Sequence, residues 1–570
     1  MRAFSTLVSL FSTATFVAAL PLVARQALEA PADDTKHVVC HHMVGNTFPY
    51  TLKDWQDDVA LASSKGIDAF ALNMGSDSWQ PDRINDAYEA AKSSNSTFKM
   101  FLSLDMTVLP CGSPDDGAKL RQLVTSNMAK DSQFFINGKA FVSTFAGENC
   151  NFGHPSAQEG WGAEFAQHPD LAGKIHFVPA FFIDPQRFGD FKSVMNGAFA
   201  WDSGWPNELT SDVAKQALAK GDDKNFLSTF SPTVKVASTS ITGEASSIVQ
   251  KLKDTLSSLL SPTQKAVSNL IGDTAWDTVY LKGLGTLGGL QKRDDPSSGK
   301  PTYMAAAAAN FFTHYGADTF NKNFAYLGDQ FLLAKRWESI INNRDQYDII
   351  ELLTWNDFGE SHYIGPIKGA LPKSEAWTIG FDHTAFLDVN KYYIEAFKTG
   401  KFPEITEDRV VMYSRPHIAA ANVPDPVGFP KNADLFQDNV WALIFASAPS
   451  TVTLNGQVSQ VPKGVSKVAA AIKPGDGISA KLDRNGATTV TVDGGDFKFN
   501  GSPQAYNFNY FVVGAGANDG QDTPAPTSPS ASPALPASSA SSSSALATPS
   551  TSPTSLSATS STPTATATQK

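Results

Sequence analysis

The feature that most constrains the fold is a regular alternation of short apolar runs and longer amphipathic segments that begins at His37. Eight runs are almost wholly apolar, and they cover about residues 37–45, 67–75, 99–107, 140–148, 175–184, 197–205, 302–312 and 347–355. Runs of this kind fit strands that are covered on both faces, as in a parallel sheet. Amphipathic segments such as "TLKDWQDDVALASSKG" stand between them. The pattern predicts an α/β fold, a TIM-type (β/α)₈ barrel over about residues 37–405.

The remaining segments differ in character. The regular spacing fails at about 230–300, which we interpret as an insertion that includes the dibasic pair Lys292-Arg293. From about 410 to 515 the chain consists of short β-prone pieces with turn signals between them, which predicts an antiparallel β-sandwich. Residues 516–570 are rich in Ser, Thr and Pro, and we expect a disordered, O-glycosylated tail.

The N-terminal segment predicts export. An apolar stretch follows a single arginine and ends in small residues, so residues 1–20 are expected to be a signal peptide and 21–36 a short linker. No other segment is long and apolar enough to span a membrane. The net charge is −11, and no long basic stretch is present, which argues against nucleic acid as a partner. We expect a secreted or cell-wall-associated monomer.

Three cysteines occur in the chain. Cys111 and Cys150 both follow predicted strand ends, so we expect them to form a disulfide, whereas Cys40 lies within an apolar strand and is expected to be a buried free thiol. No Cys/His spacing predicts a metal site, and we expect none. The sequon at Asn95 is the better of two candidate glycosylation sites, because a proline follows the second sequon.

Carboxylates, amides and aromatic residues gather where the predicted strands end, which in a (β/α)₈ barrel is one mouth. They are His41, Asn73, Asp77, Trp79, Asp105, Glu148, Asp184, Asp202, Trp205, Trp355, Asn356, Asp357, Glu360 and His362. Acids among aromatic residues, without a metal pattern, favour glycoside hydrolysis. One carboxylic acid protonates the leaving oxygen, and a second carboxylate activates water or attacks the anomeric carbon. Aromatic faces can stack on sugar rings, while amides and carboxylates bind hydroxyls.

Four motifs carry a resemblance to a known family. They are "TWNDFGESHYIGP", "VVCHHMVGN", "GIDAFALNMGSDSWQ" and "FAWDSGWP". Together they resemble the fungal α-1,3-glucanases (mutanases) of glycoside hydrolase family 71. The resemblance implies a secreted (β/α)₈ enzyme with an accessory β-sandwich. Such an enzyme would cut α-1,3-linked glucan of fungal walls with inversion and without a cofactor, and we expect endo action.

The same resemblance implies the catalytic residues. Asp357 and Glu360 match the paired acids, with Glu360 expected as general acid and Asp357 as general base, although their order stays open. Asp68 matches a third acid. The alternatives are that Asp357 caps a helix, that Glu360 is a surface acid, and that Asp68 forms a structural ion pair.

Substrate contacts are expected from the other residues at the strand ends. His41 is either a sugar contact or a hydrogen-bonded core histidine. Trp79, Trp205 and Trp355 are expected to face sugar rather than core. His362, Asn73, Asp77, Asp105, Asp202 and Asn356 complete the predicted binding residues.

One segment departs from the family pattern. Before "FFTH" the family has a proline-containing segment that ends in tryptophan, whereas this chain has an alanine run and Asn310. A stacking surface beside the cleft is therefore expected to be absent. Two alternatives follow: an inactive wall-associated glucan-binding protein, and a hydrolase of another α-glucan linkage.

Overall fold

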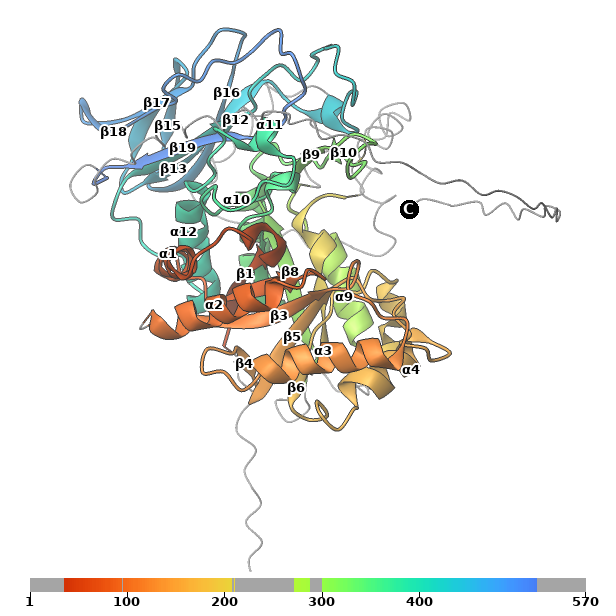
Figure 1. Ribbon diagram of the computed structural model, residues 1–570. Coiled ribbons are helices and arrows are strands. Elements are labelled where there is room, and N and C mark those ends of the chain that lie inside the picture. The colour runs from red at the N-terminus through yellow and green to blue at the C-terminus, as the bar shows by residue number, and fades with distance from the viewer. Residues whose placement is uncertain (1–34, 95, 208–209, 211–270, 288–299, 520–570) are drawn as a thin grey trace, which may run out of the picture. The chain divides into compact units, whose positions relative to one another are not determined.

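The computed structural model describes residues 35–94, 96–207, 210, 271–287 and 300–519 (Figure 1). Several sequence predictions lie outside these ranges: the signal peptide, the glycosylation site Asn95, the pair Lys292-Arg293 and nearly all of the tail. Among the described residues, no helix is long and apolar enough to cross a membrane.

Each of the eight apolar runs contains a parallel strand of one curled sheet. The strands are β1 (His37–Met43), β2 (Ala69–Met74), β3 (Lys99–Asp105), β5 (Lys139–Phe145), β6 (Ile175–Phe177), β7 (Gly197–Ala200), β8 (Thr302–Ala308) and β11 (Ile349–Leu353). Neighbours in sequence pair with one another except β6 and β7, which form no strand ladder, and β11 returns to pair with β1. Two backbone hydrogen bonds cross from β7 to the β6 region, from Asn196 N–H to Phe177 O and from Phe199 N–H to Pro179 O. The short strand β4 (Phe135–Ile136), which the sequence did not predict, pairs antiparallel with β5.

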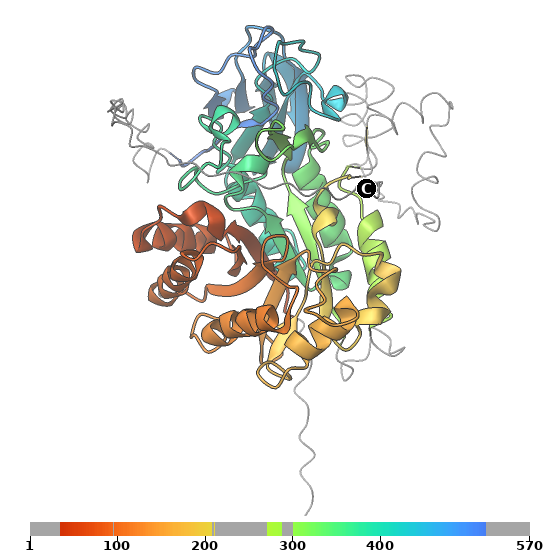
Figure 2. The ribbon, with the colours of Figure 1, turned by 45° about the vertical axis from the view of Figure 1, so that its right-hand side comes forward.

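A helical segment follows each parallel strand (Figure 2). These segments are α1 (Leu52–Ser64), α2 (Gln80–Ser93), α3 (Pro114–Asn127), α4 (Ala157–Trp161) with η2 (Gly162–Ala166), η3 (Pro185–Phe191), α9 (Ala275–Leu284), α10 (Leu332–Asn342) and α12 (Phe386–Thr399). Helix α9 corrects one prediction. It lies within the expected insertion at 230–300, but it packs beside β7 and η3 as the helix that belongs to β7.

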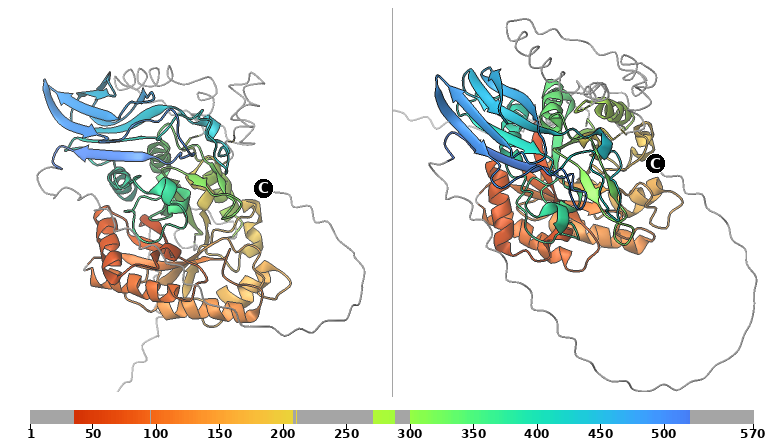
Figure 3. Two further views of the ribbon diagram at one scale, coloured as in Figure 1. Left: turned by 45° about the horizontal axis from the view of Figure 1, so that its top comes forward. Right: turned by 90° about the horizontal axis from the view of Figure 1, so that it is seen from above.

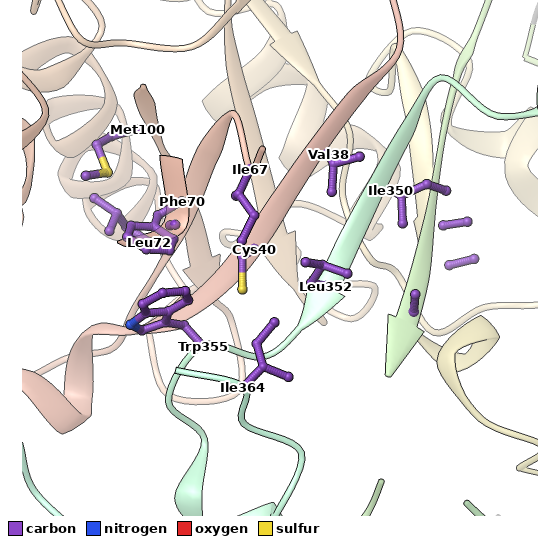
Figure 4. Packing of buried hydrophobic residues seen from close by; sticks show 14 of the residues in the cluster. Val38, Cys40, Ile67, Phe70, Leu72, Met100, Ile350, Leu352, Trp355 and Ile364 are labelled. Carbon is purple, nitrogen blue, oxygen red and sulfur yellow. The ribbon is translucent and has the colours of Figure 1, made fainter. Parts of the chain in front are cut away.

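Alternation along each strand separates two layers of the core. Outward side chains such as Val38 and Phe70 join the helices in the larger core cluster. Cys40 lies in this outer layer, close to Phe70 and Trp355 (Figure 4). Inward side chains such as Val39 and Ala71 form a second cluster inside the curled sheet. Because inward positions on several strands are small residues, the inner layer leaves room for polar side chains nearer the strand ends.

Two four-stranded antiparallel sheets follow (Figure 3). One contains β12 (Arg409–Ser414), β13 (Asn439–Ala446), β16 (Gly464–Ala471) and β19 (Phe511–Gly516), and the other contains β14 (Ser450–Leu454), β15 (Gln457–Val461), β17 (Ser479–Arg484) and β18 (Ala487–Asp493). Apolar side chains of both sheets share one core, including Met412 and Leu482. The expected antiparallel sheets are therefore present, although the sequence did not single out β15, β16 or β17.

The expected disulfide is also present. Cys111 and Cys150 are bonded, with Cα atoms 5.2 Å apart, and Cys40 is a buried free cysteine. The bond joins the loops that follow β3 and β5, two neighbouring strands. It therefore constrains the same end of the sheet at which the strands terminate.

Candidate active site

The loop that follows β11 is held against the first strand. The side chain of Asn356 accepts a hydrogen bond from Met43 N–H at 2.7 Å and donates one to Met43 O at 3.1 Å. Trp355 N–H donates to His41 O. Asn356 is fully buried, and its side-chain amide is hydrogen bonded to backbone groups. The prediction that it binds substrate is therefore corrected to a structural role.

Asp357 and Glu360 lie side by side on this loop. Asp357 Oδ1 accepts the Glu360 N–H at 3.3 Å, so Asp357 caps the short helix η6 (Phe358–Glu360). Its Oδ2 lies 3.4 Å from His362 Nε2, which is also 3.1 Å from Glu360 Oε2. Both carboxylates are partly exposed, whereas His362 is fully buried. The helix-cap alternative is thus correct for one oxygen of Asp357, and the other oxygen remains at the site.

A second cation contacts Glu360 from outside this loop. Lys322 Nζ lies 3.1 Å from Glu360 Oε1. Burial opposes ionisation of Glu360, but the contacts with His362 and Lys322 outweigh it and lower the Glu360 pKa to about 2. Burial lowers the pKa of His362, yet Asp357 and Glu360 raise it to about 9. The group therefore contains two carboxylates and two cations.

Asp357, Glu360 and His362 each have one potential metal-ligand atom, and these three atoms lie within 4.8 Å of one another. Within the described residues, no other set of three His, Cys, Asp or Glu side chains is this close. Lys322 and His362 already supply the positive charge that balances the carboxylates. The arrangement is that of a charge-balanced acid pair, and we assign no metal to it.

The ring of His362 lies 5.2 Å from that of Trp205 and 5.4 Å from that of Phe311, and the partly exposed Trp201 lies beside them. Its ring lies 4.9 Å from His41, 6.3 Å from Trp205 and 6.3 Å from His362. It is only partly buried, whereas Trp205 is 4% exposed and stacks on Tyr326. The sequence prediction selected Trp205 and missed Trp201. The signal was available, because Trp201 is the first residue after β7.

His41 forms a buried pair inside the sheet. Its Nδ1 lies 2.6 Å from Glu351 Oε1, and both side chains are 1% exposed. Burial raises the pKa of Glu351, and the contact with His41 opposes this. The hydrogen-bonded core alternative is therefore correct for His41, although its ring also contacts Trp201. Glu351 was missed, although an acid within the apolar run "IIELL" is itself a signal.

Several other predicted residues surround the same end of the sheet. The charges of Asp357 and Asp105 act on Lys322, and those of Asp202 and Glu360 act on Tyr326. Asn73 is buried at the end of β2, next to Ser103 of β3.

Four further residues that the sequence predicted at the strand ends make local contacts. Asp77 accepts a hydrogen bond from Gln80 at 3.0 Å, and Trp79 contacts the exposed ring of Phe48. Glu148 accepts the Phe182 N–H, and Asp184 caps η3.

Asp68 does not join this group. It precedes β2, so it lies at the end of the parallel sheet opposite to Asp357, which follows β11. Its carboxylate accepts the Val38 N–H at 2.8 Å and pairs with Lys398 of α12. The catalytic prediction for Asp68 is therefore corrected to the ion-pair alternative.

Trp355 does not face the site either. It is fully buried in the outer layer, with its ring 5.0 Å from that of Phe70 (Figure 4). The side chain follows the outward alternation of the neighbouring strands. The prediction that Trp355 faces sugar is corrected to a core role.

Several known proteins are similar to this chain in sequence or in structure. The chain is 33% identical over 486 residues to the glucan endo-1,3-alpha-glucosidase agn1 of Schizosaccharomyces pombe, covering 84% of this chain and 94% of that protein. It is 30% identical over 521 residues to the mutanase Pc12g07500 of Penicillium rubens, covering 87% and 94%. A GH99 endo-alpha-mannosidase from Bacteroides thetaiotaomicron is structurally similar at a TM-score of 0.37 and 9% identity, covering 65% and 99%. The sequence profile of glycosyl hydrolase family 71 matches residues 34–524, and the chain belongs to this family of glycoside hydrolases.

Proposed function

We propose that the protein is an endo-acting α-1,3-glucanase that hydrolyses the α-1,3-glucan of fungal cell walls. The observation that carries the proposal is the pair of carboxylates on one loop, Asp357 and Glu360, bridged by His362 beside the partly exposed ring of Trp201. Two carboxyls supply the acid and the base of glycoside hydrolysis, and an aromatic face supports a sugar ring. The names of the relatives support the linkage.

The electrostatics support one order of roles. Glu360 is ionised in the free enzyme because Lys322 and His362 lower its pKa, and an ionised carboxylate can accept a proton but cannot donate one. We therefore assign Glu360 as the base. Asp357 is then the acid, and it must take up a proton before it can donate one to the leaving oxygen. This order is the reverse of the one expected from the sequence, where it was left open.

We also propose that cleavage inverts the anomeric centre. An inverting pair needs roughly 6.5–9.5 Å between its carboxyls to admit a water molecule. In the free site one oxygen of Asp357 and one of Glu360 lie within 4.8 Å of each other, so the proposal requires glucan and water to move the carboxyls apart. Proton NMR in the first minutes of hydrolysis tests it. We expect the β-anomer first, and an initial α-anomer would contradict inversion.

The release of reducing sugar tests the activity itself. We expect release from insoluble α-1,3-glucan, and none from starch or β-1,3-glucan. Glu360→Gln and Asp357→Asn are each expected to lower turnover by several orders of magnitude while the protein stays folded. More than about a tenth of wild-type activity in either variant argues against that residue. A protein that binds α-1,3-glucan but releases nothing would establish the wall-binding alternative.

The remaining features of the chain are proposals of the same kind. We infer that the curled sheet is a closed (β/α)₈ barrel, supported by the hydrogen bonds that Asn196 and Phe199 donate across the β6–β7 seam. We propose that the enzyme is secreted as a monomer after removal of residues 1–20. N-terminal sequencing and size-exclusion chromatography of protein from a culture medium test both statements.

A further inference from the structure

Lys322 reaches the site from a hairpin that follows β8. The hairpin contains β9 (Phe312–His314) and β10 (Asn323–Ala325), which pair antiparallel. Lys322 immediately precedes β10, and its backbone oxygen accepts the Tyr315 N–H at 2.7 Å. The side chain is half exposed, yet its ammonium lies on Glu360. A long exposed side chain has no reason to take one direction unless its backbone and its partner are both held in place.

The backbone of the hairpin is held by the segment 425–432, which lies between β12 and β13. Asn323 Nδ2 donates to Val427 O at 3.0 Å and to Gly428 O at 3.1 Å. Lys431 exchanges backbone hydrogen bonds with both ends of β10, since its N–H donates to Asn323 O and its oxygen accepts the Ala325 N–H. The residue next to Lys322 is therefore fixed by the C-terminal part of the chain.

A hydrogen bond ties the other strand of the hairpin to the same segment. His314 Nε2 lies 2.9 Å from Asp425 Oδ2, and both side chains are buried. His314 Nδ1 lies 2.8 Å from Asn323 Oδ1, so the contact extends across the hairpin. Asp425 in turn accepts the Tyr506 N–H at 3.0 Å. The anchor thus continues into the chain that leads to β19.

The two cations occupy different oxygens of Glu360. His362 contacts Oε2 of Glu360 and also contacts Asp357, whereas Lys322 contacts Oε1 of Glu360. Lys322 therefore holds Glu360 from the side away from Asp357. The titratable groups that interact with Glu360 are His362 from its own loop, Tyr315 and Lys322 from the hairpin, and Tyr326 after it. Asp357 shares His362 with Glu360, Asp105 acts on Lys322, and Asp202 acts on Tyr326. Within the described residues, Lys322 and His362 are the cations in ion-pair contact with Glu360.

We propose that Lys322 is a positioning residue that holds the Glu360 carboxylate in place for catalysis, and that the segment 425–432 keeps Lys322 there. The inference rests on the proposed function, because it assigns Glu360 the role of base. It gives the C-terminal part of the chain a role in the active site, since the segment 425–432 anchors the hairpin that brings the ammonium to the carboxylate.

The pH profile of kcat/KM tests the role of Lys322, because this profile reports groups of the free enzyme. Lys322→Met removes the ammonium while keeping the length of the side chain. We expect the acidic limb to move to higher pH by about one unit. At pH values below the limb, kcat/KM should fall about tenfold relative to wild type, and at the optimum it should change little. Lys322→Arg is expected to restore most of the wild-type profile. Lys481→Met, an exposed lysine of β17, is the matched control and should leave the profile unchanged.

An unshifted acidic limb in Lys322→Met overturns the inference, whether activity is retained or lost equally at every pH. The proposed function is tested separately by the release of reducing sugar from α-1,3-glucan by the wild type. If the wild type releases none, the proposed function fails, and if Glu360→Gln remains active, the role of Glu360 as the base fails. If Glu360→Gln is inactive and Lys322→Met keeps the wild-type limb, only the inference about Lys322 fails.

The anchoring segment needs its own variants. Asp425→Asn and His314→Gln each weaken the contact between these two side chains. Either variant tests the anchoring role, provided that it folds. We expect a shift of the acidic limb in the same direction as in Lys322→Met, but smaller. A wild-type limb in a folded variant of this kind overturns the anchoring role.

Discussion

Replacing Asp277 should destabilise the enzyme far more than an ordinary substitution. Asp277 of α9 and Arg336 of α10 are each at most 1% exposed. Arg336 Nη2 donates to Asp277 Oδ1 at 2.8 Å, Nη1 contacts the other oxygen, and the Tyr303 hydroxyl donates to Oδ1 at 2.6 Å. Asp277→Ala leaves the guanidinium buried without its carboxylate partner, although backbone oxygens such as Ala306 O still accept from it, at 3.0 Å.

Removing one member of a buried ion pair costs about 3–5 kcal/mol, whereas replacing both members by apolar residues can be nearly neutral. We therefore expect Asp277→Ala to lower the free energy of unfolding by about 3–5 kcal/mol, and the double variant Asp277→Leu/Arg336→Leu to lower it by clearly less. Guanidinium denaturation followed by tryptophan fluorescence measures both. A loss below about 1 kcal/mol for Asp277→Ala would refute the reasoning, because the side chain of Arg336 would then have found another partner.

Three further predictions concern the disulfide, His362 and Asp68. Cys111→Ser opens a disulfide that joins residues 39 apart in the chain, and denaturation should show a loss of about 2–4 kcal/mol; an unchanged midpoint contradicts this. The folded-state pKa of His362 is about 9, above the unfolded value, so its stabilisation is present below about pH 6.5 and is lost as pH rises through 9. Wild type should therefore lose more unfolding free energy than His362→Gln between pH 7 and 9, and parallel curves would contradict the assignment. Asp68→Asn should keep activity within about twofold of wild type, because the contact of Asp68 with Lys398 is partly exposed and distant from the site. A loss of activity comparable to that of Asp357→Asn would show that Asp68 acts in catalysis.

The sequence predicted the strands of the curled sheet well because each is buried on both faces and so reads as a continuous apolar run. Strand β6 is shorter than its run, in keeping with Pro179, which has no N–H to donate two residues after the strand ends. Helix α9 was assigned to an insertion, because its amphipathic pattern follows a long Ser-rich and Gly-rich stretch without a boundary. Strand β15 was missed because its alternation is weak, with only Val461 buried.

The candidate site was predicted in part. Asp357, Glu360 and His362 are near neighbours in the chain, so the loop motif was enough to bring them together. The direction of a side chain after a strand ends was not predictable in this way, which is why Trp355 and Asn356 were given the wrong roles. Lys322 could not be found at all, because it reaches Glu360 through a hairpin whose position depends on contacts with residues about a hundred positions further along the chain.

The amide of Asn356 joins two points that are 313 residues apart in the sequence. Since it stands next to Asp357, the carboxylate cannot reach its place until the last strand has docked beside the first. A ribosome-bound chain that ends before this loop, or a proteolytic fragment that has lost β1, therefore lacks the site even if most of the sheet has formed. Hydrolysis becomes possible only at the end of assembly, so enzymatic activity is itself a report that synthesis and folding of the sheet are complete.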